Sequence, residues 1–211
     1  MPINFDDLSI EQLSLLLNGL PLLSQTFWGP SKEWCQEIQR AAKTNELKNL
    51  GEIAGRHDAT QTMVSYMKTF SGLSQLNETL ETDYVRLFMS ARGGITASLH
   101  QSSYESEGGR LMGRPAKMMA SRLKAAGLAL PGEGSVPADH LAVEVEYLTL
   151  LLEGALGEDN GDFLAAAQDF ARTELGPWLL KLSQKLETET DAPFYPAAAR
   201  LLLGLVTRVA G

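Results

Sequence analysis

The chain has 211 residues, of which 44% are hydrophobic and 21% charged, a composition typical of a soluble globular protein with a sizeable core. A net charge of −8 argues against a non-specific nucleic-acid binder, which needs a basic patch, and favours a cationic ligand or peptide. Because the chain has no run of about 18 apolar residues and no basic, then apolar, secretory start, we expect a cytoplasmic protein. Its single cysteine, Cys35, excludes an intrachain disulfide and a cysteine-rich zinc site.

Hydrophobic residues recur at helical spacing along most of the first ninety positions. Leucines predict a first helix over Leu8–Leu20, which Phe27-Trp28-Gly29-Pro30 interrupts. Ser31 is a suitable N-cap for a second helix, and Gly55 ends a third. After a fourth short helix, the period continues over Leu73–Met89.

Residues 90–110 are the least regular stretch of the sequence. They contain two glycine pairs and a cluster of hydroxyl side chains, and no clear period. A segment of roughly 20 residues without an element is long for a compact domain, and such loops are usually functional or disordered. The glycines do not form a phosphate-binding loop, because the Gly-Lys-Ser/Thr ending and a preceding strand are absent. We treat this loop as a candidate hinge.

The second half of the chain is again helical. One helix begins near Arg114-Pro115 and ends at Gly127, another starts near Phe163, and a last one covers Tyr195–Val206. Pro177 predicts a kink or break. No stretch alternates like a strand, so the sequence predicts an all-α, helical-bundle-like single domain over residues 1–211 with about nine or ten helices.

The segment Val136–Tyr147 is the strongest candidate for a functional site. Pro137 suits a first helical turn and Ser135 is a plausible cap, so we expect Asp139 and His140 in the opening turn of a long helix. Exposed amides and the positive end of the helix dipole gather there. In the alternative interpretation, the aspartate caps local amides and the histidine is structural.

A second candidate face precedes the irregular loop. Tyr84, Leu87 and Phe88 share one side of a helix, where core packing is the ordinary role of Leu87 and Phe88. The hydroxyl of Tyr84 needs a partner if it is buried.

Four stretches, in this order, resemble the TorD/DmsD/NarJ family of redox-enzyme maturation chaperones. The most specific is Pro137-x-Asp139-His140-Leu141-x-x-Glu144-x-x-Tyr147. The other three are Asp83-Tyr84-x-x-Leu87-Phe88, Tyr104-Glu105-Ser106 followed by Leu111-Met112-Gly113, and Phe170-x-x-x-Glu174-Leu175-x-Pro177-Trp178. The resemblance covers about residues 80–200. Many members have histidine where this chain has Glu174, so it does not indicate a particular client.

The resemblance implies an all-helical, TorD-like, non-enzymatic chaperone in the cytoplasm, with no cofactor of its own. Such proteins bind the twin-arginine signal peptide, and some also the apo form, of a molybdopterin-containing oxidoreductase. They delay its export by the twin-arginine (Tat) route until the cofactor is inserted. The resemblance also implies a monomer or a domain-swapped homodimer, and guanine nucleotide binding has been suggested for a few members.

Such a receptor needs carboxylates beside an apolar groove, because a guanidinium pairs with a carboxylate in a bidentate fork. The predicted signal-peptide site consists of Asp139, His140, Glu144, Tyr84, Leu87, Tyr104 and Tyr147. Leu141 could line the same groove, and further carboxylates are available at Glu105, Glu107 and Glu146. For the glutamates, the alternative is a solvated helix face or loop.

Two other functions compete with this prediction. A metal-dependent phosphohydrolase could use an Asp-His pair, but His57 and His100 are the only other histidines and neither forms a ligand-like pair. A helical adaptor that binds a folded partner has the same composition and fold. The sequence contains no catalytic constellation, so we predict no enzyme activity.

Overall fold

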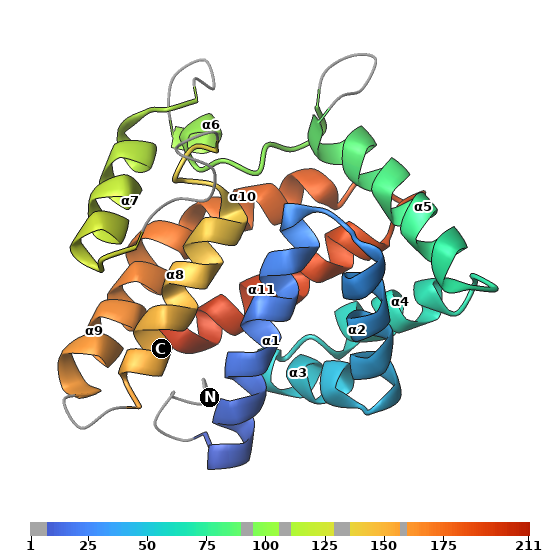
Figure 1. Cartoon of the computed structure of the whole chain (residues 1–211), viewed down its shortest axis with the longest axis horizontal. Helices are drawn as coiled ribbons and strands as arrows, with labels where there is room; N and C mark the ends of the chain where they lie inside the picture. Colours follow the sequence, from blue (N-terminus) through green and yellow to red (C-terminus); the bar gives the residue numbers. More distant parts are fainter. Residues whose placement is uncertain (1–7, 90–94, 106–110, 129–135, 157–159) are drawn as a thin grey trace.

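A computed structural model describes residues 8–89, 95–105, 111–128, 136–156 and 160–211 (Figure 1). The helices are α1 (Ile10–Trp28), α2 (Lys32–Lys43), α3 (Glu46–Ala54), α4 (His57–Met67), α5 (Leu73–Tyr84), α6 (Ser102–Glu105), α7 (Arg114–Ala125), α8 (Leu141–Gly154), α9 (Asn160–Phe170), α10 (Gly176–Leu186) and α11 (Phe194–Ala210). The π-helical segment Val85–Met89 extends α5, and a second, Ala171–Leu175, joins α9 to α10. Over the described ranges, β-structure is limited to one isolated bridge, so the all-α prediction is confirmed.

Local sequence signals explain several helix ends. Ser9 and Gln12 form a capping box at the start of α1, in which each side chain bonds the backbone N–H of the other residue. Ser31 caps α2 as predicted, accepting from the Trp34 amide at 3.1 Å. Gly55 ends α3 in the left-handed conformation, with φ +63°, which glycine adopts without strain.

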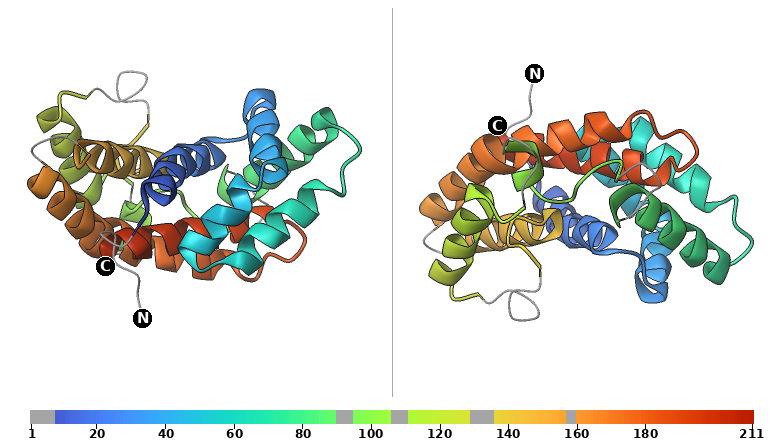
Figure 2. Two further views of the ribbon diagram at one scale, coloured as in Figure 1. Left: turned by 90° about the horizontal axis from the view of Figure 1, so that it is seen from below. Right: turned by 90° about the horizontal axis from the view of Figure 1, so that it is seen from above.

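The helices pack around α11, which crosses the middle of the molecule behind α1 (Figure 1). Helices α7, α8 and α9 lie on one side of α1, and α2 to α5 lie on the other; the two views of Figure 2 show the same division. Helix α1 therefore contacts α8 on one flank and α2 and α3 on the other.

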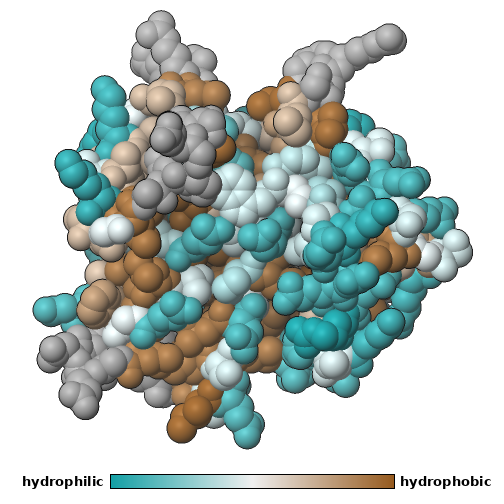
Figure 3. All heavy atoms as spheres, in the orientation of Figure 1, coloured by the Kyte–Doolittle hydropathy of each residue, from teal (hydrophilic) through white to brown (hydrophobic). Residues whose placement is uncertain are grey.

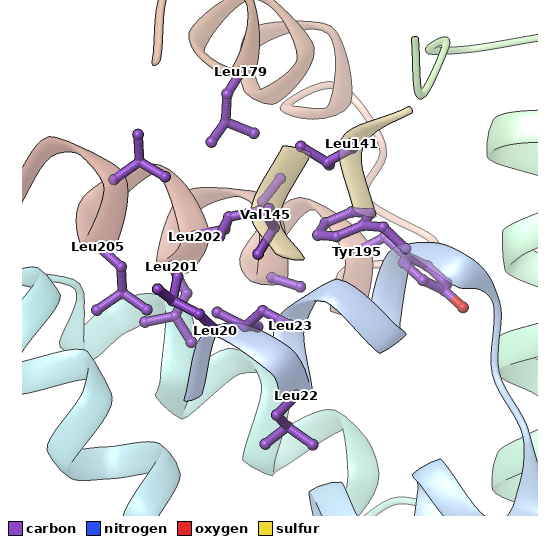
Figure 4. Close-up of a cluster of buried hydrophobic side chains, with 14 of the residues drawn as sticks. Leu20, Leu22, Leu23, Leu141, Val145, Leu179, Tyr195, Leu201, Leu202 and Leu205 are labelled. Atoms are coloured by element: carbon purple, nitrogen blue, oxygen red, sulfur yellow. The ribbon is translucent and has the colours of Figure 1, made fainter. Parts of the chain in front are cut away.

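The core forms where leucines of α1, α8, α10 and α11 meet (Figure 4). Leu20 of α1, Val145 of α8 and Leu202 of α11 point toward one another and are fully buried. Tyr195 is also buried, and its hydroxyl donates to the Leu80 carbonyl at 3.0 Å, so its polar group is satisfied. Burial of a leucine side chain contributes on the order of 2 kcal/mol, which makes this cluster the main stabilising feature.

Two boundaries differ from the sequence prediction. Helix α8 begins at Leu141, not at Pro137, because residues 137–140 form a turn in which the His140 amide donates to the Pro137 carbonyl at 3.2 Å. The predicted cap, Ser135, lies outside the described residues. The chain also does not break at Pro177: a π-helical turn just before it widens the helix and makes room for the proline ring.

The candidate hinge at about residues 90–110 is described only in part, because 90–94 and 106–110 lie outside the described residues. Its middle portion contains the short helix α6, which the sequence did not predict. Among the helices that the structure describes, none is long and apolar enough to span a membrane.

The contact between α11 and α3 depends on Gly204. A Cβ atom there would lie 2.6 Å from the Ala54 carbonyl oxygen, and backbone cannot move aside as a flexible side chain can. We expect Gly204→Ala to lower the free energy of unfolding by about 1–3 kcal/mol despite alanine's better helix propensity. Urea unfolding measures this. Thr207→Ala, an exposed change on the same helix, is the control; an unchanged Gly204→Ala midpoint would contradict the packing argument.

Candidate functional site

Two short segments that precede α6 and α8 lie side by side. His100 and His140 form an antiparallel bridge. The Gln101 amide donates to the Asp139 carbonyl at 3.0 Å, and the Leu141 amide donates to the Leu99 carbonyl at 2.8 Å. This pairing places two histidine rings and one aspartate next to each other, although forty residues separate them in the chain.

Asp139 holds the start of α6. Its side chain is fully buried, and Oδ2 accepts hydrogen bonds from the Ser102 amide, at 2.7 Å, and from the Ser102 hydroxyl. Its other oxygen, Oδ1, lies 4.0 Å from His100 Nδ1. The aspartate therefore binds the neighbouring loop rather than the amides of α8, and its carboxylate is not open to solvent.

His140 is the N-cap of α8. Its Nδ1 accepts from the Ala142 amide at 3.2 Å, and its ring stacks on Trp28 with the centroids 4.7 Å apart and an interplanar angle of 12°. His100 meets the ring edge-on at 5.0 Å. Burial, together with the neighbouring His100, lowers the pKa of His140 to about 3, so the imidazole is neutral at neutral pH. Burial also lowers the pKa of His100, which Asp139 partly offsets.

Two of the three glutamates of α8, Glu144 and Glu146, have opposite environments. Glu144 is buried, and its Oε2 accepts from the Trp178 indole at 2.8 Å. Burial raises the pKa of Glu144 well above its ordinary value, so we assign it the protonated, neutral form. Glu146 is exposed; its Oε1 accepts from the Trp28 indole at 2.7 Å and from the Ser24 hydroxyl at 3.0 Å. Glu146 thus fixes the tryptophan that covers His140.

A cleft of about 620 Å³ opens in front of these residues. Its wall combines the end of α1, the end of α5, the 95–103 segment and the turn before α8. The lining is mostly apolar or aromatic and includes Trp28, Tyr84, Phe88, Leu99, His100, Pro137 and His140. Three exposed apolar side chains, Met89, Ile95 and Leu111, also line it, with 65%, 46% and 50% of their surfaces accessible. Hydrophobic surface is visible at the upper end of α5 in Figure 3, which has the orientation of Figure 1. A surface of this kind suits an apolar ligand or peptide.

The structure brings together only some of the predicted site residues. Tyr84 and His140 line the cleft, whereas Asp139 and Glu144 are buried behind it. The Tyr84 hydroxyl donates to the Phe27 carbonyl at 3.0 Å, which supplies the partner that it needs. The remaining predicted residues lie elsewhere: Leu87 and Leu141 are fully buried in the core, Tyr104 packs on Trp178, Tyr147 packs on Phe170, and Glu105 accepts from Gln101 at 2.6 Å. Glu107 lies outside the described residues.

Sequence reasoning missed several cleft residues. Trp28 belongs to the Phe27-Trp28-Gly29-Pro30 break after α1, where a large aromatic residue at a helix end was a usable signal. His100 stood in the irregular loop without a periodic pattern, so nothing in the sequence paired it with His140. Met89 and Ile95 border the same irregular stretch.

The arrangement does not provide a metal site. Within the described part of the chain, no group of three or more His, Cys, Asp or Glu side chains could hold a metal ion. The floor of the cleft consists of aromatic rings and the two imidazoles.

Comparisons with known proteins show which family the chain belongs to. Residues 54–184, more than half of the chain, match the family model described as nitrate reductase delta subunit. The chain therefore belongs to the TorD/DmsD/NarJ family of redox-enzyme maturation chaperones, which confirms the resemblance seen in the sequence.

Proteins similar to this chain are named as chaperones. The chaperone protein TorD of Vibrio parahaemolyticus is 26% identical over 161 residues, 74% of each chain, and that of Photobacterium profundum is 28% identical over 162 residues, again 74% of each. A solved structure of a redox enzyme maturation protein from Archaeoglobus fulgidus superposes with a TM-score of 0.57 over 88% of this chain and 91% of that one. At 22% identity, this second likeness shows the shared fold alone. Both TorD relatives are named as chaperones, which agrees with the prediction of a chaperone rather than an enzyme.

The buried histidine makes stability depend on pH. Unfolded His140 takes up a proton near pH 6.5, whereas the folded ring does so only at about 3, so the free energy of unfolding falls as the pH drops below 6.5. His140→Asn keeps a capping side chain but cannot titrate. Between about pH 7 and 5.5, the unmodified protein should lose about 1 kcal/mol more than this variant in urea unfolding. Parallel pH curves for the two proteins would show that His140 is not buried in the neutral form.

The buried Glu144 should make stability depend on pH in the opposite direction. The folded protein keeps a proton that the unfolded chain releases above pH 4.5, so stability falls as the pH rises above that value. Glu144→Gln removes this fall, and its stability relative to the unmodified protein should increase by at least about 1 kcal/mol between pH 5 and 8. Glu153→Gln, an exposed change on the same helix, should give a flat difference. A flat difference for Glu144→Gln as well would indicate an ionised carboxylate.

Proposed function

We propose that this protein is a cytoplasmic maturation chaperone that binds the twin-arginine signal peptide of a molybdopterin-containing oxidoreductase. Binding would delay export by the Tat route until the cofactor is inserted. The protein would also bind the apo form of the same enzyme. The proposal includes a single chaperone domain over residues 1–211.

The observation that carries this proposal is the apolar cleft. Side chains as large and apolar as Met89, Ile95 and Leu111 are left largely exposed around an aromatic floor. Scattered exposed hydrophobic residues are ordinary, but a group around one concave surface is characteristic of a docking site. The apolar stretch of a signal peptide could bury these side chains as a helix in a groove.

The charge distribution also supports a cationic peptide. The chain carries a net charge of −8, and the exposed carboxylate of Glu146 lies at the margin of the cleft, hydrogen-bonded to Trp28. An arginine of the peptide could approach this carboxylate without disturbing the core. By contrast, the buried positions of Asp139 and Glu144 support a positioning role: Asp139 fixes the 99–102 segment and Glu144 fixes Trp178.

Calorimetric titration with a synthetic twin-arginine signal peptide of a molybdoenzyme tests the proposal, with a twin-lysine version as the peptide control. The double variant Ile95→Ser/Leu111→Ser should weaken binding by roughly 10- to 100-fold, because each side chain is already about half buried and contributes about 1 kcal/mol when the rest of its surface is covered. Leu156→Ser/Leu180→Ser removes two exposed leucines that lie outside the cleft, and should bind like the unmodified protein.

The outcomes separate the functional hypotheses. Equal weakening in both double variants would show that the cleft is not the binding surface. No binding of any such peptide, together with binding of the apo-enzyme body, would restrict the client to the mature enzyme. Binding of neither would favour the helical adaptor.

A further inference from the structure

A second concave surface lies between α1, α2 and α3, and we call it the α1–α3 groove. It has a volume of about 870 Å³, and none of its lining residues lines the apolar cleft. It follows one face of α1 from Ile10 to Gln25, with Glu37 and Arg40 of α2 and Glu46 and Leu50 of α3 opposite. Figure 1 shows α2 and α3 on the opposite side of α1 from α8.

The groove has an apolar floor. Leu22 and Leu50 are buried at its base, and Leu15 is half-buried. At its open end, 88% of the surface of Ile10 is accessible, the largest exposure of any large hydrophobic residue in the described part of the chain. Ile10 therefore extends the apolar floor to the exposed rim of the groove.

Carboxylates outnumber cations along the same groove. Its lining contains Glu11, Glu37 and Glu46, but only one cation, Arg40. Arg40 is paired with Glu46 at 2.6 Å. Among the residues that the structure describes, Glu11 and Glu37 form no ion pair within 4.0 Å, and both side chains are exposed; the charge of Glu37 nevertheless helps to raise the pKa of Arg40. The two walls of the groove thus carry more negative than positive charge above an apolar floor.

The family match does not include this surface. The matching model covers residues 54–184, whereas the residues that line the groove lie between 10 and 50. The matching family model therefore gives no information about the α1–α3 groove.

We propose that the α1–α3 groove docks a cationic amphipathic segment of a partner protein, with its basic side chains on Glu11 and Glu37 and its apolar side chains on Ile10 and Leu15. Charge complementarity and the apolar floor select this occupant over an acidic or purely polar segment. The inference does not depend on signal-peptide recognition in the apolar cleft.

The test uses a fluorescein-labelled synthetic peptide of about 15 residues, the length of the groove, with leucine and lysine at helical spacing. Fluorescence anisotropy at low salt measures its affinity for the full chain. Glu11→Gln/Glu37→Gln should weaken binding by about three- to tenfold, because two exposed ion pairs are lost. Glu78→Gln/Glu153→Gln removes the same charge from exposed positions outside the groove, and should bind like the unmodified protein.

A steric variant separates the groove from general attraction to an acidic surface. Ser14 is exposed and lines the groove, so Ser14→Trp should fill it while all carboxylates remain, and should weaken binding at least as much as the charge variant. Thermal unfolding confirms that each variant is folded. Equal weakening by the two charge variants, or full binding to Ser14→Trp, would overturn the proposal. Loss of binding in Ile95→Ser/Leu111→Ser alone would place this peptide in the apolar cleft and would overturn it as well.

Discussion

The arrangement of the apolar cleft depends on the buried carboxylate of Asp139. It accepts from both the amide and the hydroxyl of Ser102, and the backbone pairing of Leu99–Gln101 with Asp139–Leu141 surrounds it. A buried carboxylate without partners would cost several kcal/mol, so these hydrogen bonds oblige the two segments to remain together. The 95–103 segment is thereby held beside α8, with His100 next to His140.

This packing keeps His140 and Glu144 in their neutral forms. His140 lies between Trp28 and His100, and Glu144 lies against Trp178; both side chains are buried, so ionisation of either would place a charge out of contact with water. Among the described residues that line the cleft, none is charged at neutral pH, and the carboxylate of Glu146 lies at its margin, where it accepts from the Trp28 indole. The polar motif around Asp139 thus lies behind a mostly apolar surface.

The sequence predicted the fold better than the site. Apolar periodicity and the signals at Ser31 and Gly55 predicted helices that the structure confirms, because these depend on contacts within a few residues. The start of α8 was predicted four residues too early, because a proline that suits a first helical turn also suits the turn before one. The cleft could not be predicted in full, because its wall is formed by the pairing of His100 with His140 across forty residues, and no local pattern encodes that pairing.

Helix α1 relates the two concave surfaces. Trp28 at its end lines the apolar cleft, and Gln25, less than one turn earlier, lines the α1–α3 groove. Both surfaces are built on one helix that packs against α8 on one flank and α3 on the other. On the α3 flank, Leu50 occupies the space that a Cβ atom at Gly19 would need. A rigid α1 would hold two ligand segments at a constant separation, and binding of one segment would raise the effective concentration of the other. A client with an apolar segment and a separate cationic segment could therefore be bound more tightly than either surface alone permits.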